Sequence, residues 1–267
     1  MLARRVIVCL DVQGARVVKG TRFVSLRDVG DPVELAERYE AAGADEIVFL
    51  DISASSDDRA TLLEIVARTA ERLFIPLTVG GGIRSVDDVS RALQAGADKV
   101  SINSAAVAHP ELLGECAARY GAQCVVASID AKREGSSWLV RTRGGRSDTA
   151  LDAVEWAREC AERGAGEILL TSIDRDGVRG GYDVELTRAV ASVVNVPVVA
   201  SGGAGSAAHV VEAFRDGNAD AALVAGILHD GVTTVAELKR AMEDAGIGVR
   251  STLAEAGTHG QPAEGRV

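Results

Sequence analysis

Short apolar runs rich in Val, Ile and Leu alternate along the chain with longer Ala-rich stretches whose apolar residues recur at helical spacing. Such runs are typical of buried parallel strands, and such stretches of the helices that cover them. The pattern predicts strands near 5–11, 46–51, 75–79, 98–103, 124–130, 167–172, 196–200 and 221–225. It predicts helices near 32–42, 58–73, 85–95, 110–120, 149–163, 184–193, 206–216 and 233–245. Strict alternation of this kind predicts an α/β fold, a single (β/α)₈ barrel.

The second half of the pattern repeats the first. Gly-Ala-Asp-Glu-Ile-Val at 43–48 matches Gly-Ala-Gly-Glu-Ile-Leu at 164–169, and Gly-Gly-Gly-Ile at 80–83 matches Ser-Gly-Gly-Ala at 201–204. Both matches have an offset of 121 residues. We therefore expect two (βα)₄ half-barrels whose equivalent sites face each other across one axis.

Three segments depart from the alternation. Residues 13–30 are polar and exceed the ~4–6 residues of a common βα loop, which predicts a long loop where an active-site lid would lie. Residues 132–147 hold Trp138 between glycines and predict a small hairpin. Residues 251–267 lack periodicity, which predicts a disordered tail and leaves residues 1–250 as the barrel domain.

Composition narrows the possible functions. The 267 residues are 47% hydrophobic and 25% charged, as in soluble globular proteins. The net charge of −10 argues against non-specific binding of nucleic acid, because phosphate backbones recruit clustered Lys and Arg. A small phosphorylated substrate stays possible, since backbone N–H groups at helix N-termini hold phosphate.

The four cysteines show no metal-ligand spacing, so we expect reduced thiols. The chain has no apolar run of ~18 residues and enters a strand at once, so we expect no membrane span, no signal peptide and a cytoplasmic location.

Two carboxylates end equivalent strands. Active sites of such barrels lie at the C-terminal ends of the strands, where Asp11 and Asp130 are expected. There a carboxyl with a tuned pKa can serve as general acid or base. The alternative is that a strand-end Asp caps the following turn through its side chain.

Two glycine-rich turns also lead from a strand into a helix, at 80–82 and 201–203. Either turn can be a phosphate cradle or simply a tight turn that needs positive φ. Their presence in both halves favours the cradle and hence a substrate with a phosphate at each end. Lys19, in the long loop, can clamp a phosphate or be one more solvated lysine.

At the opposite end of the predicted barrel, Arg5, Glu46, Lys99 and Glu167 begin four strands. Charged residues at a barrel floor normally form a structural salt-bridge plug. An opening toward a partner is the rarer alternative. No Ser-His-Asp or His-rich metal arrangement is visible, and we expect neither a metal nor a cofactor.

The motifs in combination resemble the cyclase subunits of imidazole glycerol phosphate synthases over residues 1–250. The resemblance rests on the two aspartates and on Val-Val-Lys-Gly at 17–20, Asp-Ile at 51–52, Gly-Gly-Gly-Ile-Arg at 80–84, Asn-Ser at 103–104, Thr-Ser-Ile-Asp-Arg-Asp-Gly at 171–177 and Ser-Gly-Gly-Ala-Gly at 201–205. It implies an enzyme of histidine biosynthesis that takes ammonia from a glutaminase subunit. With the ribulosyl substrate PRFAR it would form imidazole glycerol phosphate and the purine precursor AICAR.

The resemblance also implies residue roles. Asp11 and Asp130 would be the catalytic pair, and Asp98 would lie at the glutaminase interface. An ammonia gate would comprise Arg5, Glu46, Lys99 and Glu167. Substrate and phosphate contacts would come from Lys19, Asp51, Gly82, Asn103, Ser104, Thr171, Asp176, Gly177, Ser201, Gly202, Gly203, Ala225 and Gly226. Ser104 and Gly226 depart from the family, which often has Thr and Ser there, so Gly226 offers only its N–H.

Two other functions remain open at this point. The sister isomerase of the same pathway is also a duplicated half-barrel with two strand-end aspartates, but it has no use for a gate in the floor. A non-catalytic phosphate-binding barrel is a second alternative, against which the intact Asp11 and Asp130 argue.

Overall fold

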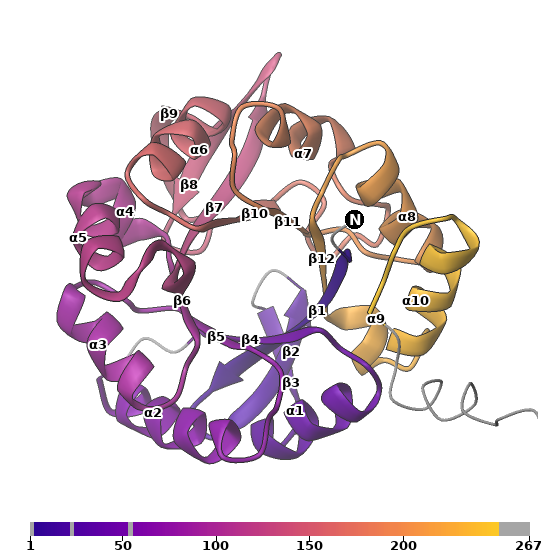
Figure 1. Cartoon of the computed structure of the whole chain (residues 1–267), viewed down its shortest axis with the longest axis horizontal. Coiled ribbons are helices and arrows are strands. Elements are labelled where there is room, and N and C mark those ends of the chain that lie inside the picture. The colour runs from indigo at the N-terminus through magenta and orange to yellow at the C-terminus, as the bar shows by residue number, and fades with distance from the viewer. Residues whose placement is uncertain (1–2, 22–23, 53–55, 251–267) are drawn as a thin grey trace, which may run out of the picture.

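The computed structural model describes residues 3–21, 24–52 and 56–250, and these contain a closed parallel barrel. Figure 1 shows the barrel as a ring of strands with the helices outside it. The ring runs in the order β1, β4, β5, β6, β7, β10, β11, β12, and pairs of β7 with β10 and of β12 with β1 complete it. The strands are β1 (Arg5–Gln13), β4 (Glu46–Asp51), β5 (Leu77–Gly80), β6 (Lys99–Ile102), β7 (Val125–Glu134), β10 (Glu167–Ser172), β11 (Val198–Ser201) and β12 (Ala221–Val224). The predicted (β/α)₈ barrel is confirmed.

The helices follow the predicted alternation. They are α1 (Pro32–Ala41), α2 (Ser56–Ala70), α3 (Val86–Gln94), α5 (Glu111–Tyr120), α6 (Ala153–Glu162), α7 (Val184–Ala191), α8 (Ala207–Arg215) and α10 (Val235–Asp244). Two short helices, α4 (Ser104–Ala108) and α9 (Gly226–His229), and a 3₁₀ turn at Ala122–Cys124 were not predicted. In the described part of the chain, no helix is long and apolar enough to cross a membrane.

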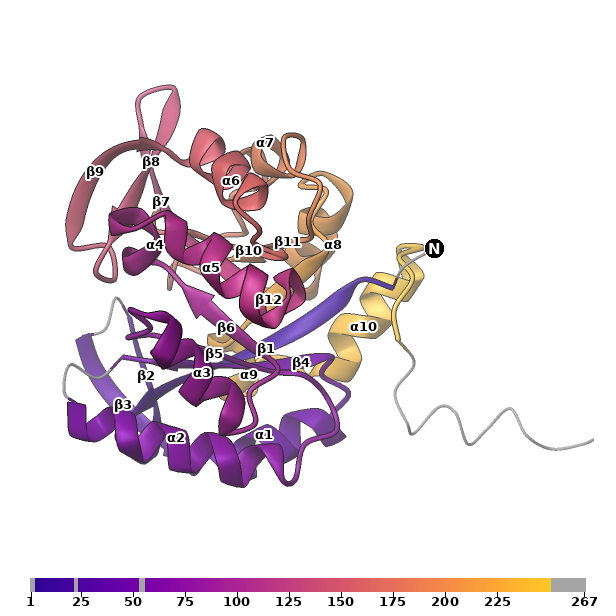
Figure 2. The same cartoon turned by 60° about the vertical axis from the view of Figure 1, so that its left-hand side comes forward.

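Two antiparallel ribbons extend the barrel wall. The long loop predicted over residues 13–30 is wrong, because these residues form β2 (Arg16–Thr21) and β3 (Val24–Gly30) on the end of β1. The hairpin predicted over residues 132–147 is confirmed, as β7 continues into β8 (Ser137–Thr142) and β9 (Ser147–Asp152). Since β9 occupies residues 147–152, α6 starts later than predicted. Figure 2 shows both ribbons at the end of the barrel away from the N-terminus. The predicted tail, residues 251–267, lies outside the described residues.

The duplication is visible in how the helices begin. Asp31 and Asp152, 121 residues apart, each accept two backbone N–H groups at the start of α1 and α6. Ser85 and Ser206, also 121 residues apart, each accept one at the start of α3 and α8. An N-cap satisfies backbone donors that the first helical turn leaves free. The two halves therefore share local chemistry as well as topology.

A Gly-Ala-Asp phrase or a close variant of it precedes four barrel strands, at 43–45, 96–98, 164–166 and 218–220, and joins neighbouring strands. Asp45, Asp98 and Asp220 each accept a hydrogen bond, of 2.8, 2.8 and 3.1 Å, from a backbone N–H near the start of the preceding barrel strand. The fourth copy has Gly166 instead, where a Cβ would lie 2.2 Å from the carbonyl oxygen of Ala122. The aspartates thus hold the starts of neighbouring strands together at the barrel floor. Gly166 replaces the aspartate in one copy because a side chain there would clash with Ala122.

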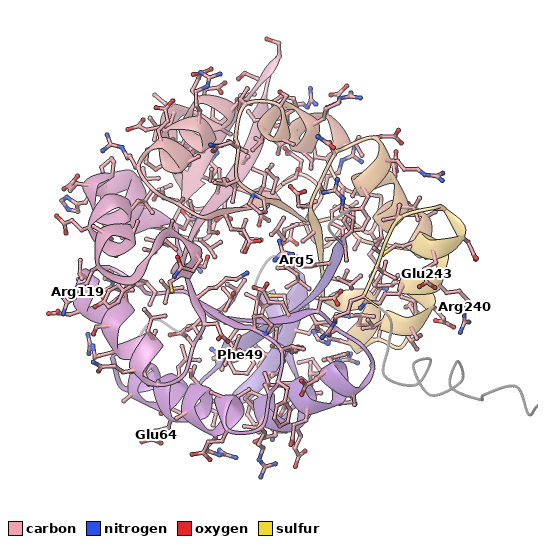
Figure 3. The ribbon with its side chains drawn as sticks, in the orientation of Figure 1. Arg5, Phe49, Glu64, Arg119, Arg240 and Glu243 are labelled. Carbon is pink, nitrogen blue, oxygen red and sulfur yellow. The ribbon has the colours of Figure 1, made fainter. Side chains whose placement is uncertain are left out.

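Alternate residues of each strand point into the barrel. A large core lies between the strands and the helices, while a small apolar cluster lines the inside of the ring. The inner cluster comprises Ile7, Cys9, Val48, Val126, Leu169, Val199, Ala221 and Leu223. Figure 3 shows Arg5 inside the ring and Glu64, Arg119, Arg240 and Glu243 at its outer rim. On β1 this period places Arg5 at one end of the barrel interior and Asp11 at the other.

Candidate active site

Asp11 and Asp130 lie on β1 and β7, at the end of the barrel that carries the two ribbons, since Asp11 pairs with Val18 of β2 and Asp130 with Arg141 of β8. Burial raises the pKa of Asp11 to about 7, the charge of Asp176 raises it too, and the thiol of Cys9, 3.9 Å from Oδ1, opposes the rise. Burial also raises the pKa of Asp130 to about 6, against a hydrogen bond from Asn103, while Asp176 adds to the rise. The two carboxyls therefore titrate near neutral pH, as general acids and bases require.

Asn103 connects this pair to a neighbouring turn. Its side-chain Nδ2 donates to Oδ2 of Asp130 at 3.0 Å. Its Oδ1 is buried and, among the described residues, one of only two buried side-chain polar atoms without a partner; the other is the hydroxyl of Tyr120. Buried acceptors are normally satisfied, so Oδ1 of Asn103 is a ready acceptor for a donor on a bound ligand.

A buried histidine supports β1 beneath Asp11. Nε2 of His229 faces the carbonyl oxygen of Cys9 at 3.1 Å and must donate to it, which leaves Nδ1 to accept from the hydroxyl of Tyr39 at 2.7 Å. Burial lowers the pKa of His229 to about 4, so the ring is neutral near pH 7. His229 thus fixes the backbone two residues before Asp11. This role was not predicted, because His229 is the last residue of α9, a helix too short to be recognised from the sequence.

The glycine turns have the conformation that the tight-turn alternative requires. Gly81 and Gly82 have φ of 87° and 66°, and the equivalent Gly202 and Gly203 have φ of 86° and 105°. A Cβ on Gly81 would lie 2.2 Å from the carbonyl oxygen of Asp51, and one on Gly202 2.7 Å from that of Ser172. The backbone alone therefore demands glycine at Gly81 and Gly202, whatever the turns bind.

The two unpredicted short helices are a second pair of equivalent features. Asn103 precedes α4 and Ala225 precedes α9, with φ/ψ of −115°/−93° and −137°/−82°. Neither residue makes a side-chain capping hydrogen bond. Both helices start directly after a barrel strand, so their N-termini face the mouth in both halves. Ser104 opens α4, and its hydroxyl accepts from the backbone N–H of Arg143 at 2.9 Å.

The remaining predicted contacts gather around the same mouth. Thr171 pairs with Asp130 on one side and with Ser201 on the other. The backbone N–H of Asp176 donates to the carbonyl of Ser172 at 2.9 Å, and Gly177 follows with a φ of 73°. The structure thus brings the predicted mouth residues to one end of the barrel.

Beside α9, positive side chains gather over the turn at Gly226. Lys19, on β2, donates to the carbonyl oxygen of Gly226 at 3.2 Å and pairs with Asp230. Arg179 donates to the same carbonyl at 3.3 Å and also pairs with Asp230. Arg27, on β3, reaches Asp230 at 3.1 Å. Sequence reasoning identified only Lys19 of these charged residues, because the other three belong to no motif on which the resemblance rests.

The floor of the barrel carries a closed ring of alternating charges. Glu46 accepts from Arg5 at 3.1 Å and from Lys99 at 2.8 Å. Glu167 accepts from Lys99 at 2.8 Å and pairs with Arg5. Burial lowers the pKa of Arg5 and is the largest single effect, but the charge and hydrogen bond of Glu167, together with the charges of Glu46 and Asp220, outweigh it, so the net change is upward. The four predicted floor residues are therefore in mutual contact, as both the plug and the gate interpretations require.

The apolar interior of the barrel separates the charged ring at the floor from Asp11 and Asp130 at the mouth. Arg5 and Asp11 are six positions apart on β1, which corresponds to about 20 Å at the usual rise of a strand. Asp98 is exposed at the same end as the ring, next to Lys99. Among the residues that the structure describes, no group of three or more His, Cys, Asp or Glu is placed to hold a metal ion. All four cysteines are free thiols.

Comparison with known proteins identifies the family of the chain. A family model described as histidine biosynthesis protein matches residues 5–234. The imidazole glycerol phosphate synthase subunit HisF of Myxococcus xanthus (strain DK1622) is 72% identical over 251 residues, which cover 94% of this chain and 99% of that protein. These matches confirm the resemblance seen in the sequence motifs, and the chain belongs to the histidine biosynthesis protein family.

Proposed function

We propose that this chain is an ammonia-dependent cyclase of the lyase class, which converts PRFAR into imidazole glycerol phosphate and AICAR. The observation that carries the proposal is the pair Asp11 and Asp130 at the barrel mouth, with pKa values of about 7 and about 6, in a chain 72% identical to a synthase subunit. The reaction adds ammonia, closes a ring and cleaves a C–N bond, and each step moves protons.

The two carboxyls can divide these proton transfers between them. At pH 7 a group with a pKa of about 6 is mostly ionised, so Asp130 is available as a base. Asp11, with a pKa of about 7, is close to half protonated and is available as an acid. The free thiol of Cys9 and the neutral ring of His229 hold the β1 side of this pair in place.

The two halves of the mouth would hold the two phosphates of the substrate. One cradle would comprise Gly82 and the start of α4 at Asn103 and Ser104. The other would comprise Gly177, Gly203 and the start of α9 at Ala225 and Gly226. Asp51, Thr171, Asp176, Ser201 and Gly202 complete the walls between them. Gly226 has no side chain to contact a phosphate. Lys19 supplies a positive charge there, since the Nζ of Lys19 lies beside the turn at Gly226.

The floor is proposed as the entry for ammonia from a glutaminase subunit, which together with this chain would form a heterodimer. The ring of Arg5, Glu46, Lys99 and Glu167 lies where such a partner would dock, and Asp98 is exposed beside it. The relative from Myxococcus xanthus is named as a synthase subunit, which supports an assembly of this kind. Free thiols fit the proposed cytoplasmic location.

The deciding experiment is turnover of PRFAR with ammonium salts by this chain alone. Formation of imidazole glycerol phosphate and AICAR supports the cyclase and excludes both alternatives. Isomerisation of the precursor of PRFAR, without ring formation, identifies the sister isomerase. Binding of PRFAR without any conversion identifies a non-catalytic phosphate-binding barrel.

A further inference from the structure

Four charged side chains from separate parts of the chain meet beside Gly226. Lys19 comes from β2, Arg27 from β3 and Arg179 from the segment between β10 and α7, while Asp230 ends α9. Both oxygens of the Asp230 carboxylate are used: Oδ2 accepts from Lys19 and Arg179, and Oδ1 accepts from Arg27 at 3.1 Å. We call these four residues the Asp230 cluster.

The Asp230 cluster is unbalanced in charge. Three cations share one carboxylate, so these four residues together carry two surplus positive charges. The hydrogen bonds from Lys19 and Arg179 lower the pKa of Asp230 to about 2, so its carboxylate is ionised at any pH at which the enzyme would work. A surplus of two positive charges is equal in magnitude and opposite in sign to the charge of a phosphate dianion.

The cluster also occupies a specific place. Lys19 and Arg179 both donate to the carbonyl oxygen of Gly226, the first residue of α9. A Cβ on Gly226 would lie 3.6 Å from Cε of Lys19 and 3.7 Å from Nη2 of Arg179. The two cations therefore stand in van der Waals reach of the turn that is proposed to hold one substrate phosphate.

We propose that Asp230 is an internal stand-in for that phosphate: in the ligand-free protein it gathers Lys19, Arg27 and Arg179 over the α9 turn, and it yields them to the phosphate when substrate binds. The inference rests on the proposed phosphate cradle at Gly226. Asp230 is thereby a positioning residue. It keeps the cations and the β2–β3 ribbon in place before binding, and it weakens phosphate binding because it competes for the same donors.

The direct test is isothermal titration of the full chain with inorganic phosphate. Asp230→Asn removes the competing charge while keeping the size of the side chain, and it should tighten phosphate binding by about 3- to 10-fold, the scale of one exposed charge pair. Asp216→Asn is the matched control, because Asp216 is an exposed acid that likewise ends a helix, α8. The control variant should bind phosphate as the unchanged protein does.

A double-mutant cycle assigns the effect to this cradle rather than to the one at Ser104. In a Lys19→Ala background, Asp230→Asn should give a smaller gain in phosphate affinity, because the two residues share one interaction. Amide hydrogen exchange gives an independent reading. The ribbon residues 16–21 and 27–30 should exchange faster in ligand-free Asp230→Asn than in the unchanged protein, and phosphate should reduce the difference.

Each outcome decides a separate point. If the unchanged protein turns over PRFAR and binds phosphate, but Asp230→Asn binds phosphate equally well or more weakly, the stand-in is refuted and the proposed function stands. If the gain in affinity is the same with Lys19 and with Ala at position 19, the cluster does not act as a unit and the stand-in is refuted as well. If the unchanged protein neither binds phosphate nor converts PRFAR, the proposed function falls, and the inference falls with it.

Discussion

Asn103 donates a 3.0 Å hydrogen bond to Asp130 and so joins a catalytic candidate to the helix start proposed to hold a phosphate. The bond favours the ionised carboxylate and opposes the rise in the pKa of Asp130 that burial causes. Occupation of the cradle and the proton affinity of the carboxyl are therefore linked through one side chain.

Asn103→Ala should accordingly raise the pKa of Asp130. If Asp130 must be ionised to act as a base, the acid limb of the pH profile of kcat/KM should move to higher pH, while the alkaline limb should stay in place. The profile must be measured at a fixed concentration of free ammonia, because the ammonium fraction itself changes with pH. An unmoved acid limb with only a higher KM would make Asn103 a phosphate contact alone.

Asp11→Asn and Asp130→Asn should each lower kcat by ~10²–10⁴ while substrate affinity stays within a few-fold, the usual scale of acid–base loss. Steady-state kinetics with ammonium salts measure both constants. Asp216→Asn again serves as the control for a surface carboxylate. An unchanged kcat with a large rise in KM would show that the two aspartates bind substrate rather than transfer protons.

Asp11→Asn should also stabilise the protein at alkaline pH. The pKa of Asp11 is raised on folding to about 7, so its protonated form is favoured in the native state. Its contribution to stability is full below the pKa of the unfolded chain, about 4, and is lost as pH rises through about 7. Relative to the unchanged protein, the Asn variant should gain about 1–3 kcal/mol at pH 8 and little at pH 4. Thermal unfolding at the two pH values checks this. A gain of equal size at both would refute the electrostatic cause.

The Lys99→Ala variant distinguishes the two interpretations of the floor ring, an ammonia gate and a structural plug. As a gate residue, Lys99 should be dispensable with ammonium salts, which enter from the open mouth, and needed when glutamine and a glutaminase supply the nitrogen. As a plug residue, its loss leaves Glu46 and Glu167 with one cation fewer and costs about 3–5 kcal/mol whatever the nitrogen source. Melting temperature and both activities should be measured together.

Lys239→Ala is the matched control for that experiment. Lys239 is more deeply buried than Lys99, with 3% against 17% of the side chain exposed, and it pairs with Asp45 at 2.7 Å, but it lies outside the ring. It should lower stability and affect the two nitrogen sources equally. A Lys99→Ala variant that behaves in the same way would refute the gate.

Gly81→Ala and Gly226→Ala should differ in their effect on stability. Gly81 has a φ of 87°, and a Cβ there would strike the carbonyl of Asp51, so the change should cost more than ~2 kcal/mol. A Cβ on Gly226 would meet its nearest atoms at ordinary contact distance, so the change should cost less than ~1 kcal/mol. Chemical unfolding without ligand makes the comparison. Equal costs would show that the turns are not restricted by their backbone.

Much of this arrangement was predictable because the barrel strands are buried on both faces. Continuous apolar runs such as Val6–Leu10 are hard to mistake, and a carboxylate after such a run marks the mouth. The β2–β3 ribbon escaped prediction because Arg16–Thr21 has only two apolar residues, Val17 and Val18, although Val17 belongs to the core. Helix α9 has four residues, too few for a helical period to appear. The meeting of Lys19 with Asp230, 211 positions apart, follows only from the closed ring.

The floor ring also has a consequence for the duplicated architecture. Arg5, Glu46 and Lys99 belong to the first half of the chain, and Glu167 belongs to the second. Among these four residues, the first half alone would therefore carry one surplus positive charge, and the second half would carry an unpaired carboxylate. The four side chains of the proposed gate thus attract the two half-barrels to each other. They would repel a second copy of the same half, so they favour the correct pairing of the halves.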